Sequence, residues 1–375
     1  MTSSLRELRK RRLLSQEELA DRAQVSVMSV RRWEAGKRPQ PLHLRRLCEV
    51  LEATAEDLGF PVELPAALNT IGLDPDDLPD LEEIQGATLR LRRSYSTTRP
   101  EELRRRIDER LRQIRQLLVR GRPGWRRDLL EAAAWLTLLR STVLADVKDY
   151  EPAQGAVHAA RELAQQLGHR DLEAWTWETE AWLNANDRRD FDARELAGRG
   201  IEIAPAGGHG LVAATLQRAR VNGSLGEEAE ALRDVLAGER ALARVGEVEW
   251  PDDHYSIDPS KALYYISGTM AALHHPREVI EHAAEVVRQN EQPATRNYWP
   301  TRVISARMEW AVALAELGEE DEAYAMAVRA LEALPFYRLG PVQRTERLLR
   351  QLRDPRLRQQ LAGELEERLG DGTAL

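Results

Sequence analysis

A short segment near the N-terminus carries the side chains whose types and spacing most clearly imply a chemistry. One face of a predicted short helix holds Val27, Met28, Arg31 and Arg32, and Ser26 stands at the start of this helix as a further candidate for DNA contact. Arginine can pair with guanine through two parallel hydrogen bonds, and valine or methionine can contact the methyl group of thymine. This face therefore has the chemistry needed to contact base edges in the major groove of DNA.

A second set of basic and polar side chains flanks that helix. It comprises Arg9, Arg11, Arg12, Gln16, Lys37 and Arg38. Such side chains are suited to phosphate oxygens, which position a protein on DNA without specifying its sequence. The alternative is that the arginines form only a solvated helix face. Their place beside an ordered pair of helices favours the DNA contacts.

Two short helices and a tight turn must position these groups. Ser15 followed by Glu17 and Glu18 predicts the start of the first helix, because a hydroxyl caps free amides and acids suit the first turn. Ser26 caps the second helix, and Gly36 follows its end. Helices this short cannot bury a core alone, so they need the apolar helices predicted at residues 5–14, 41–51 and 55–58. The sequence predicts a small bundle of five helices.

Residues 4–59 resemble the Xre and phage-repressor helix-turn-helix family, whose members have a lambda-repressor-like fold. The resemblance is carried by Gln16, residues 18–20, 25–26 and 32–37, Pro39 and Leu44. It implies that Gln16 contacts backbone phosphate and that the helix after Ser26 enters the major groove. One position departs from the family, because the turn usually has glycine where this chain has Gln24. The resemblance implies that double-stranded operator DNA is a partner of residues 1–60.

Composition and charge bound the rest of the chain. With 375 residues it is long enough for two or more domains, and no apolar run approaches the roughly 18 residues of a membrane helix. Its single cysteine, Cys48, excludes an intrachain disulfide and fits a reducing cytoplasm. Residues 1–60 hold 12 Lys and Arg against 9 Asp and Glu, whereas the rest holds 42 against 53. One weakly basic head binds DNA weakly, so we expect a homodimer on a palindromic site.

Helix follows helix in the remainder, so the whole chain is predicted to be all-α. An acidic linker with four prolines spans residues 61–80, and residues 81–375 form a repeat domain. Its repeat is a set of small residues at i, i+4 and i+7, which lets helices pack closely. The five copies are Ala153, Val157 and Ala160; Ala193, Ala197 and Gly200; Ala231, Val235 and Gly238; Val279, Ala283 and Val286; and Ala323, Ala327 and Ala330. They resemble tetratricopeptide repeats (TPR), which implies a superhelix whose concave surface is lined by the first helix of each hairpin.

A concave helical surface that binds a ligand needs polar or aromatic side chains in mid-helix. The candidates are Asn184, Arg218, Asn222, Tyr264, Tyr265, Arg307 and Trp310. Asparagine can bind a peptide backbone through both its donor and its acceptor, and arginine can bind a carboxylate. The alternative is that they are repeat core or solvated residues. An insertion at 246–259 could cover a ligand, and the amphipathic segment 341–369 is either a capping pair or a dimer contact.

The sequence motifs typical of enzyme active sites are incomplete in this chain. His274 and His275 lack further ligands at metal spacing. The glycines Gly207, Gly208 and Gly210 lack the lysine and hydroxyl of a phosphate loop. We therefore predict no catalytic residue, no metal and no cofactor.

The order of the domains resembles Gram-positive regulators of the RRNPP type, which join an Xre head to a tetratricopeptide body and respond to short signalling peptides in quorum sensing. The resemblance implies a cytoplasmic, DNA-binding transcription regulator whose effector is a peptide or another small molecule. One alternative is a DNA-tethered scaffold that recruits a partner protein through the repeats. Another is a phage or toxin–antitoxin repressor, although such repressors usually lack so large a body.

Overall fold

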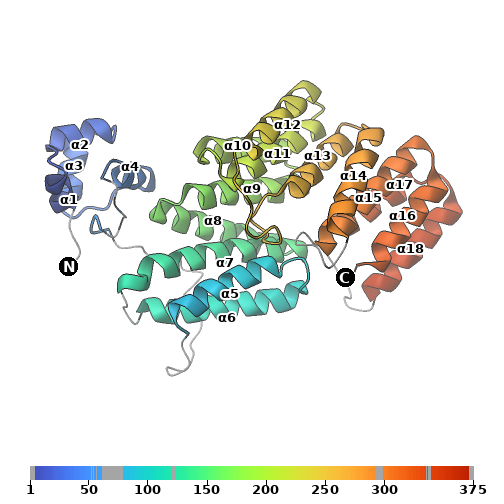
Figure 1. Cartoon of the computed structure of the whole chain (residues 1–375), viewed down its shortest axis with the longest axis horizontal. Helices are drawn as coiled ribbons and strands as arrows, with labels where there is room; N and C mark the ends of the chain where they lie inside the picture. The colour runs from blue at the N-terminus through green and yellow to red at the C-terminus, as the bar shows by residue number, and fades with distance from the viewer. Residues whose placement is uncertain are drawn as a thin grey trace.

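The structure is a computed structural model that describes residues 5–51, 53, 55, 57–60, 79–119, 123–291, 299–334, 336 and 339–370. Within these residues the chain is helical and contains no strand. Figure 1 shows a small N-terminal group of helices beside a longer array of paired helices. The predicted all-α fold, a helix-turn-helix bundle followed by stacked hairpins, is confirmed.

The head contains four described helices. They are α1 (Leu5–Arg11), α2 (Gln16–Arg22), α3 (Val27–Glu34) and α4 (Pro41–Leu51). Ser15 accepts from the Glu18 amide, and the Glu18 carboxylate accepts from the Ser15 amide, which forms a capping box. Ser26 caps α3 by accepting from the Ser29 amide. The predicted fifth helix lies partly outside the described residues, and its Ala55 and Leu58 are buried in the head core.

The turn between α2 and α3 is tight because Gln24 adopts a left-handed backbone conformation, with φ of 53°. Such a conformation costs a side-chain-bearing residue roughly 1–2 kcal/mol, which explains why glycine is usual at this turn in the resembling family. Gly36, which follows α3, has φ of 94° and ends the helix as expected.

Seven pairs of antiparallel helices make up the described part of the array. They are α5 (Leu81–Arg93) with α6 (Pro100–Val119), α7 (Arg126–Asp146) with α8 (Tyr150–Leu167), α9 (Arg170–Asn186) with α10 (Asp190–Ile203), α11 (His209–Ser224) with α12 (Glu228–Leu242), α13 (Pro259–Ala272) with α14 (Pro276–Asn290), α15 (Pro300–Leu317) with α16 (Glu320–Glu332), and α17 (Leu339–Gln351) with α18 (Pro355–Gly370). A short 3-10 helix, η2 (Pro123–Trp125), precedes α7. Each helix packs against its partner, which confirms the predicted stacking of hairpins.

The small-residue signature explains the close packing. All five copies are buried in the second helices α8, α10, α12, α14 and α16. A Cβ atom at Gly200 would lie 3.0 Å from the Cβ of Ala214, and one at Gly238 would overlap the Leu216 side chain. Larger side chains there would push α11 away from its neighbours.

The array curves until distant parts of the chain meet. Helix α17 contacts α7. In the loop after α5, the Ser96 hydroxyl lies 2.8 Å from that of Thr301 and accepts from the Thr301 amide at 3.0 Å. Segments far apart in the sequence therefore meet here, and Tyr95 and Thr301 at this meeting point line a partly open cavity, called the chamber below.

The predicted insertion, residues 246–259, covers part of this chamber. It is fastened to the end of α5, where the Arg92 guanidinium pairs with the Asp253 carboxylate and the Arg92 carbonyl accepts from the His254 amide. Its Tyr255 is buried between the rings of Trp135 and Trp175. The insertion is thus a fixed part of the wall.

The C-terminal pair resolves one of the alternatives that the sequence left open. Leu348, Leu352, Leu357, Leu361 and Leu365 are all buried in one cluster with residues of α15 and α16. Their apolar stripe is used within the chain, so α17 and α18 form a capping pair. None of the described helices has the length and apolarity needed to cross a membrane.

The head is docked on the array through α4, which packs against α8. Arg45 on α4 pairs with Glu173 on α9, with 3.1 Å between Nη1 and Oε2. The Glu173 side chain is only 2% exposed, and it also accepts from Gln165 at 2.9 Å. The division into residues 1–60, 61–80 and 81–375 stays a prediction, because residues 61–78 lie outside those described.

Candidate nucleic-acid interface and central cavity

The outer face of α3 is the first candidate site. Ser26, Met28, Arg31 and Arg32 are exposed, and Met28 exposes 60% of its surface. Val27 is half-buried, and it packs against the head core. Of the four side chains predicted to face a DNA groove, Met28, Arg31 and Arg32 therefore lie on the solvent-facing side of α3 and Val27 lies at its edge, while Ser26 caps the helix.

A chain of hydrogen bonds links this face to α1 and α2. Arg31 Nε donates to Gln16 Oε1 at 3.2 Å, and Gln16 Nε2 donates to Glu34 Oε2 at 2.7 Å. Gln16 thus opens α2 at the predicted place, with its side chain fixed between α2 and α3. Burial raises the pKa of Glu34, but hydrogen bonds from Arg9 and Gln16 outweigh it, so the pKa lies below its ordinary value.

Arg9 differs from the sequence expectation. It was expected to contact phosphate, but its side chain is buried and donates to Glu34 Oε1 at 2.6 Å and to the Leu14 carbonyl at 2.7 Å. These bonds tie α1 to α3, because a buried guanidinium needs a carboxylate and carbonyl partners. Arg9 therefore holds the bundle together, and Glu34, to which the sequence analysis assigned no role, is its partner.

The other flanking residues keep the expected exposure. Arg11 and Arg12 lie at the end of α1, and Lys37 and Arg38 follow α3; all four are exposed. Two short helices, a tight turn and a basic outer face on the second helix define the class of DNA-binding helix-turn-helix domains.

The comparisons with known proteins agree with that class for the head. The helix-turn-helix family model matches residues 5–58, which span α1 to α4. No curated protein matches the chain. The match covers the head and none of the repeat array, so the array is interpreted from its own geometry.

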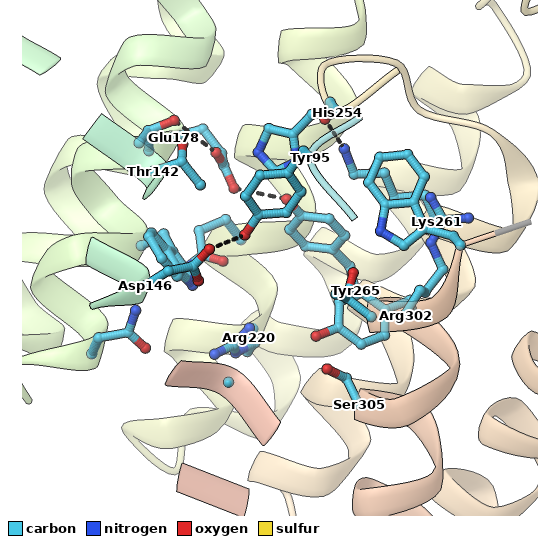
Figure 2. A pocket seen from close by; sticks show the side chains of 18 of the residues that line it. Tyr95, Thr142, Asp146, Glu178, Arg220, His254, Lys261, Tyr265, Arg302 and Ser305 are labelled. Atoms are coloured by element: carbon cyan, nitrogen blue, oxygen red, sulfur yellow. Dashed lines mark hydrogen bonds between the residues drawn. The ribbon is translucent and has the colours of Figure 1, made fainter. Parts of the chain in front are cut away.

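The second candidate site is the chamber inside the array, a cavity of about 160 Å³. First helices of six successive hairpins contribute to its wall, namely α7, α9, α11, α13, α15 and α17. Its polar and charged lining residues include Asp146, Glu178, Gln217, Arg220, Lys261, Arg302 and Arg344, and its aromatic ones include Tyr95, Trp175, Trp182, His254, Tyr264, Tyr265 and Trp299. Figure 2 shows side chains from distant segments gathered around one space.

One wall combines a buried acid and a buried amine. Tyr265 Oη donates to Glu178 Oε1 at 2.8 Å, and burial raises the pKa of Glu178. Lys261 donates to the His254 carbonyl and lies 4.9 Å from the centre of the Trp175 ring. Burial, reinforced by the charge of Arg302, lowers the pKa of Lys261 to about 7. This wall can therefore gain or lose a proton near neutral pH.

Two arginines in the wall are held by carboxylates behind it. Arg302 Nη1 pairs with Asp258 at 3.1 Å and donates to Asn290 Oδ1 at 3.1 Å. Arg344 Nε donates to Glu309 at 2.6 Å, and its Nη2 donates to the Tyr264 hydroxyl at 3.1 Å. Their positions are set by the protein.

Several buried polar groups on residues that line the cavity have no hydrogen-bond partner among the described residues. They are both amide atoms of Gln217, Nε1 of Trp175, Nη2 of Arg302 and Nδ2 of the half-buried Asn186. The first three side chains are almost fully buried, at 0% exposure for Gln217, 1% for Trp175 and 4% for Arg302. A buried polar group left unsatisfied costs about 1–3 kcal/mol, so a set of them in one wall needs a partner from water or a ligand.

The cavity includes little of the ligand surface predicted from the sequence. Tyr264 and Tyr265 line it. Arg218 and Asn222 instead bind the Asp234 carboxylate between α11 and α12, at 2.6–3.0 Å. The other three candidates also lie outside the cavity wall. Asn184 donates to the Glu180 carbonyl, Arg307 pairs with Glu291, and Trp310 is partly buried against two hydrophobic clusters.

Sequence reasoning missed Gln217 and Arg220, which are neighbours of the predicted Arg218. One signal was present, because Gly268 on α13 leaves room for the Arg220 side chain, and a Cβ there would lie 3.2 Å from Arg220 Cδ. Its meaning depends on which helices are adjacent, which the sequence did not specify. Within the described residues, no cluster of three or more His, Cys, Asp or Glu side chains is arranged to hold a metal ion.

Proposed function

We propose that this protein is a sequence-specific, DNA-binding transcription regulator whose repeat domain, residues 81–375, dimerises and binds an effector in the central cavity. The observation that carries the proposal is the exposed basic face of α3 in a head whose helix pair and family match are those of DNA-binding domains. The linker at 61–80 joins the two parts.

In this proposal the head reads DNA through α3. Arg31 and Arg32 bind guanine edges and Met28 contacts thymine methyl groups, with Ser26 and Val27 at the start of the helix. Gln16, Arg12, Lys37 and Arg38 bind phosphates and set the register. Arg9 has no direct DNA contact, because its guanidinium is committed to Glu34 and the Leu14 carbonyl.

Helix α9 connects the cavity to the head. Its Glu173 binds Arg45 of the head, and its Trp175, Glu178 and Trp182 line the cavity. A ligand that prefers one position of α9 therefore shifts the population of docked heads. In a homodimer that shift changes how two heads fit a palindromic operator.

The effector class implied by the domain order is a short peptide, as in TPR-containing regulators of the RRNPP type. The partly open cavity of about 160 Å³ supports a ligand, or a ligand end, of limited size. Dimerisation is supported by the low positive charge of one head, whose contribution to phosphate binding is small.

The test starts from selection of genomic fragments by the purified full-length protein. Binding to the best fragment is then measured by fluorescence anisotropy for wild type, Arg32→Ala and the control Arg233→Ala, whose arginine is exposed on α12. We expect a steep salt dependence, a loss of about 1–3 kcal/mol for Arg32→Ala and no loss for the control. Failure to enrich any site, or equal binding by Arg32→Ala and wild type, would count against the proposal.

A second candidate, the DNA-tethered scaffold, is favoured by one observation. Leu232 and Leu236 lie one turn apart on α12, and they expose 37% and 56% of their surface. Neighbouring exposed leucines on a convex helix suit docking of a partner protein. A partner that co-purifies with wild type and is lost in Leu232→Ser/Leu236→Ser, while ligands leave DNA affinity unchanged, would favour the scaffold.

A further inference from the structure

We propose that the central cavity binds a compact ligand through a carboxylate, which Arg220 anchors and the buried N–H groups of Arg302, Gln217 and Trp175 help to bind. This inference rests on the proposal that the repeat domain binds an effector, and it specifies the chemistry of that effector.

Arg220 is the first reason. Its guanidinium comes from α11, and Figure 2 shows it at the cavity with Glu178, Lys261 and Arg302 around the same space. Among the described residues no carboxylate lies within ion-pair distance of Arg220, whereas Arg302 and Arg344 pair with Asp258 and Glu309. Arginine stays charged at any physiological pH and binds a carboxylate through two parallel hydrogen bonds.

The second reason is the imbalance between donors and acceptors. Among the buried atoms of the lining residues, Nε1 of Trp175, Nη2 of Arg302, Nε2 of Gln217 and Nδ2 of Asn186 are donors without a protein partner, against one such acceptor, Oε1 of Gln217. Asp146 Oδ2 accepts from the Tyr95 hydroxyl at 2.9 Å, and Glu178 accepts from Tyr265. The unsatisfied buried groups of the lining are therefore mostly donors, and a carboxylate is the acceptor-only group that suits them.

The remaining lining limits the body of the ligand. Trp175, Trp182, Trp299, Tyr264 and Tyr265 supply aromatic surface, which suits an apolar or aromatic group. A water needs about 10–15 Å³ of such space, so a cavity of 160 Å³ holds roughly ten non-hydrogen atoms. An arylacetic acid fits this volume, and so does the C-terminal residue of a short peptide.

The experiment uses full-length protein and matched probes. Phenylacetate is compared with phenylacetamide and phenethylamine by isothermal titration, together with quenching of the fluorescence of the lining tryptophans. We expect the acid to bind at least about tenfold tighter than the amide and the amine. Two further probes, Gly-Gly-Phe and its C-terminal amide, show whether the carboxylate that binds belongs to a peptide end or to a small organic acid. Preference for the free-acid tripeptide over phenylacetate indicates a peptide end, and the reverse indicates a small organic acid.

Variants of two cavity residues test whether the cavity is responsible for the preference for the acid over the amide. Arg220→Gln should lower the affinity for the acid at least about tenfold and remove the difference between acid and amide, whereas Arg233→Gln should change neither. Gln217→Met provides a second measurement, because it removes two unsatisfied buried atoms at nearly constant volume. We expect a higher melting temperature without ligand, together with several-fold weaker binding of phenylacetate.

Three results would overturn the inference: equal or undetectable binding of acid and amide by wild type, tighter binding of the amine, or an acid preference that survives in Arg220→Gln. A lower melting temperature in Gln217→Met would show that ordered water satisfies this residue, which also contradicts the assignment. These measurements involve no DNA. Loss of operator selection with an intact acid preference would therefore refute the regulator and leave the ligand chemistry standing.

Discussion

The ion pair between Arg45 and Glu173 makes a quantitative prediction about how the head is held. Arg45→Gln removes the cation and leaves the Glu173 carboxylate, which is 2% exposed, with the Gln165 amide as its remaining hydrogen-bond partner among the described residues. Breaking a buried pair typically costs about 3–5 kcal/mol. Since the Arg45 side chain is 18% exposed, we expect a smaller loss of about 2–3 kcal/mol in docking free energy. The population of undocked heads should rise roughly 30- to 150-fold, given that 1.4 kcal/mol is a factor of ten.

The single thiol of the chain reports this population. Cys48 lies on α4, and burial raises its pKa to about 12, while Arg127 of α7 is close enough to oppose that shift. The thiolate is the reactive form, so labelling by a disulfide reagent at pH 8 is slow while the head is docked. We expect Arg45→Gln to react faster than wild type by up to the factor above. Arg46→Gln is the control, because Arg46 donates to the Gln24 carbonyl within the head.

The outcome that would refute this reasoning is specific. Equal labelling rates for wild type, Arg45→Gln and Arg46→Gln would mean that the ion pair does not hold the head. A faster rate accompanied by a lower melting temperature of the head helices would mean that the head unfolds and does not undock. Glu173→Gln gives an independent reading, because it keeps an acceptor for Arg45 while it removes the buried charge, so its effect should be smaller than that of Arg45→Gln.

Two further predictions concern the wall and the packing of the array. Burial lowers the folded-state pKa of Lys261 to about 7, so the unfolded chain binds more protons above pH 7 and this lysine makes stability rise with pH. From pH 7.0 to 8.5, wild type should therefore gain about 1–2 kcal/mol relative to Lys261→Met, and a parallel pH dependence of the two melting temperatures would contradict this. Gly238→Ala should lose about 1–3 kcal/mol in urea unfolding because its methyl group overlaps Leu216. Gly198→Ala meets no atom within 4 Å and should gain up to about 1 kcal/mol, so equal effects would refute the packing argument.

The head could be predicted closely because its signals are local. Ser15, Ser26 and Gly36 set helix ends through contacts within a few residues. The small-residue signature predicted the stacking for a similar reason, since each copy reports how closely its own helix approaches a neighbour. Arg9 escaped prediction because its partner Glu34 is 25 residues away. A basic residue near a DNA-binding helix looks the same in sequence whether it faces phosphate or a buried acid.

The cavity was harder to predict because it depends on how each helix is rotated about its axis and on contacts between segments far apart in the sequence. Gln217, Arg218 and Arg220 lie within one turn of α11, and each residue along the helix turns the side-chain direction by 100°. Arg218 faces Asp234 on α12, whereas Gln217 and Arg220 face the cavity. Only the rotation of α11 about its own axis within the array decides which of these side chains point into the cavity. Ser96 and Thr301 are 205 residues apart in the sequence but form a hydrogen bond in the structure. A local sequence pattern cannot predict such a contact.

The free energies of head docking and of ligand binding limit how far an effector can shift the population of docked heads through α9. A ligand moves an equilibrium only by the difference between its affinities for the two states. The contact of Glu173 with Arg45 contributes about 2–3 kcal/mol, and a ligand with micromolar affinity binds with about 8 kcal/mol. Such a ligand releases the head when its affinities for the two states differ by roughly a third of its binding free energy. The distance is short, because Glu173 and the cavity-lining Trp175 are two residues apart on one helix. A small rotation of α9 that optimises ligand contacts at Trp175 would therefore also displace the Glu173 carboxylate from Arg45.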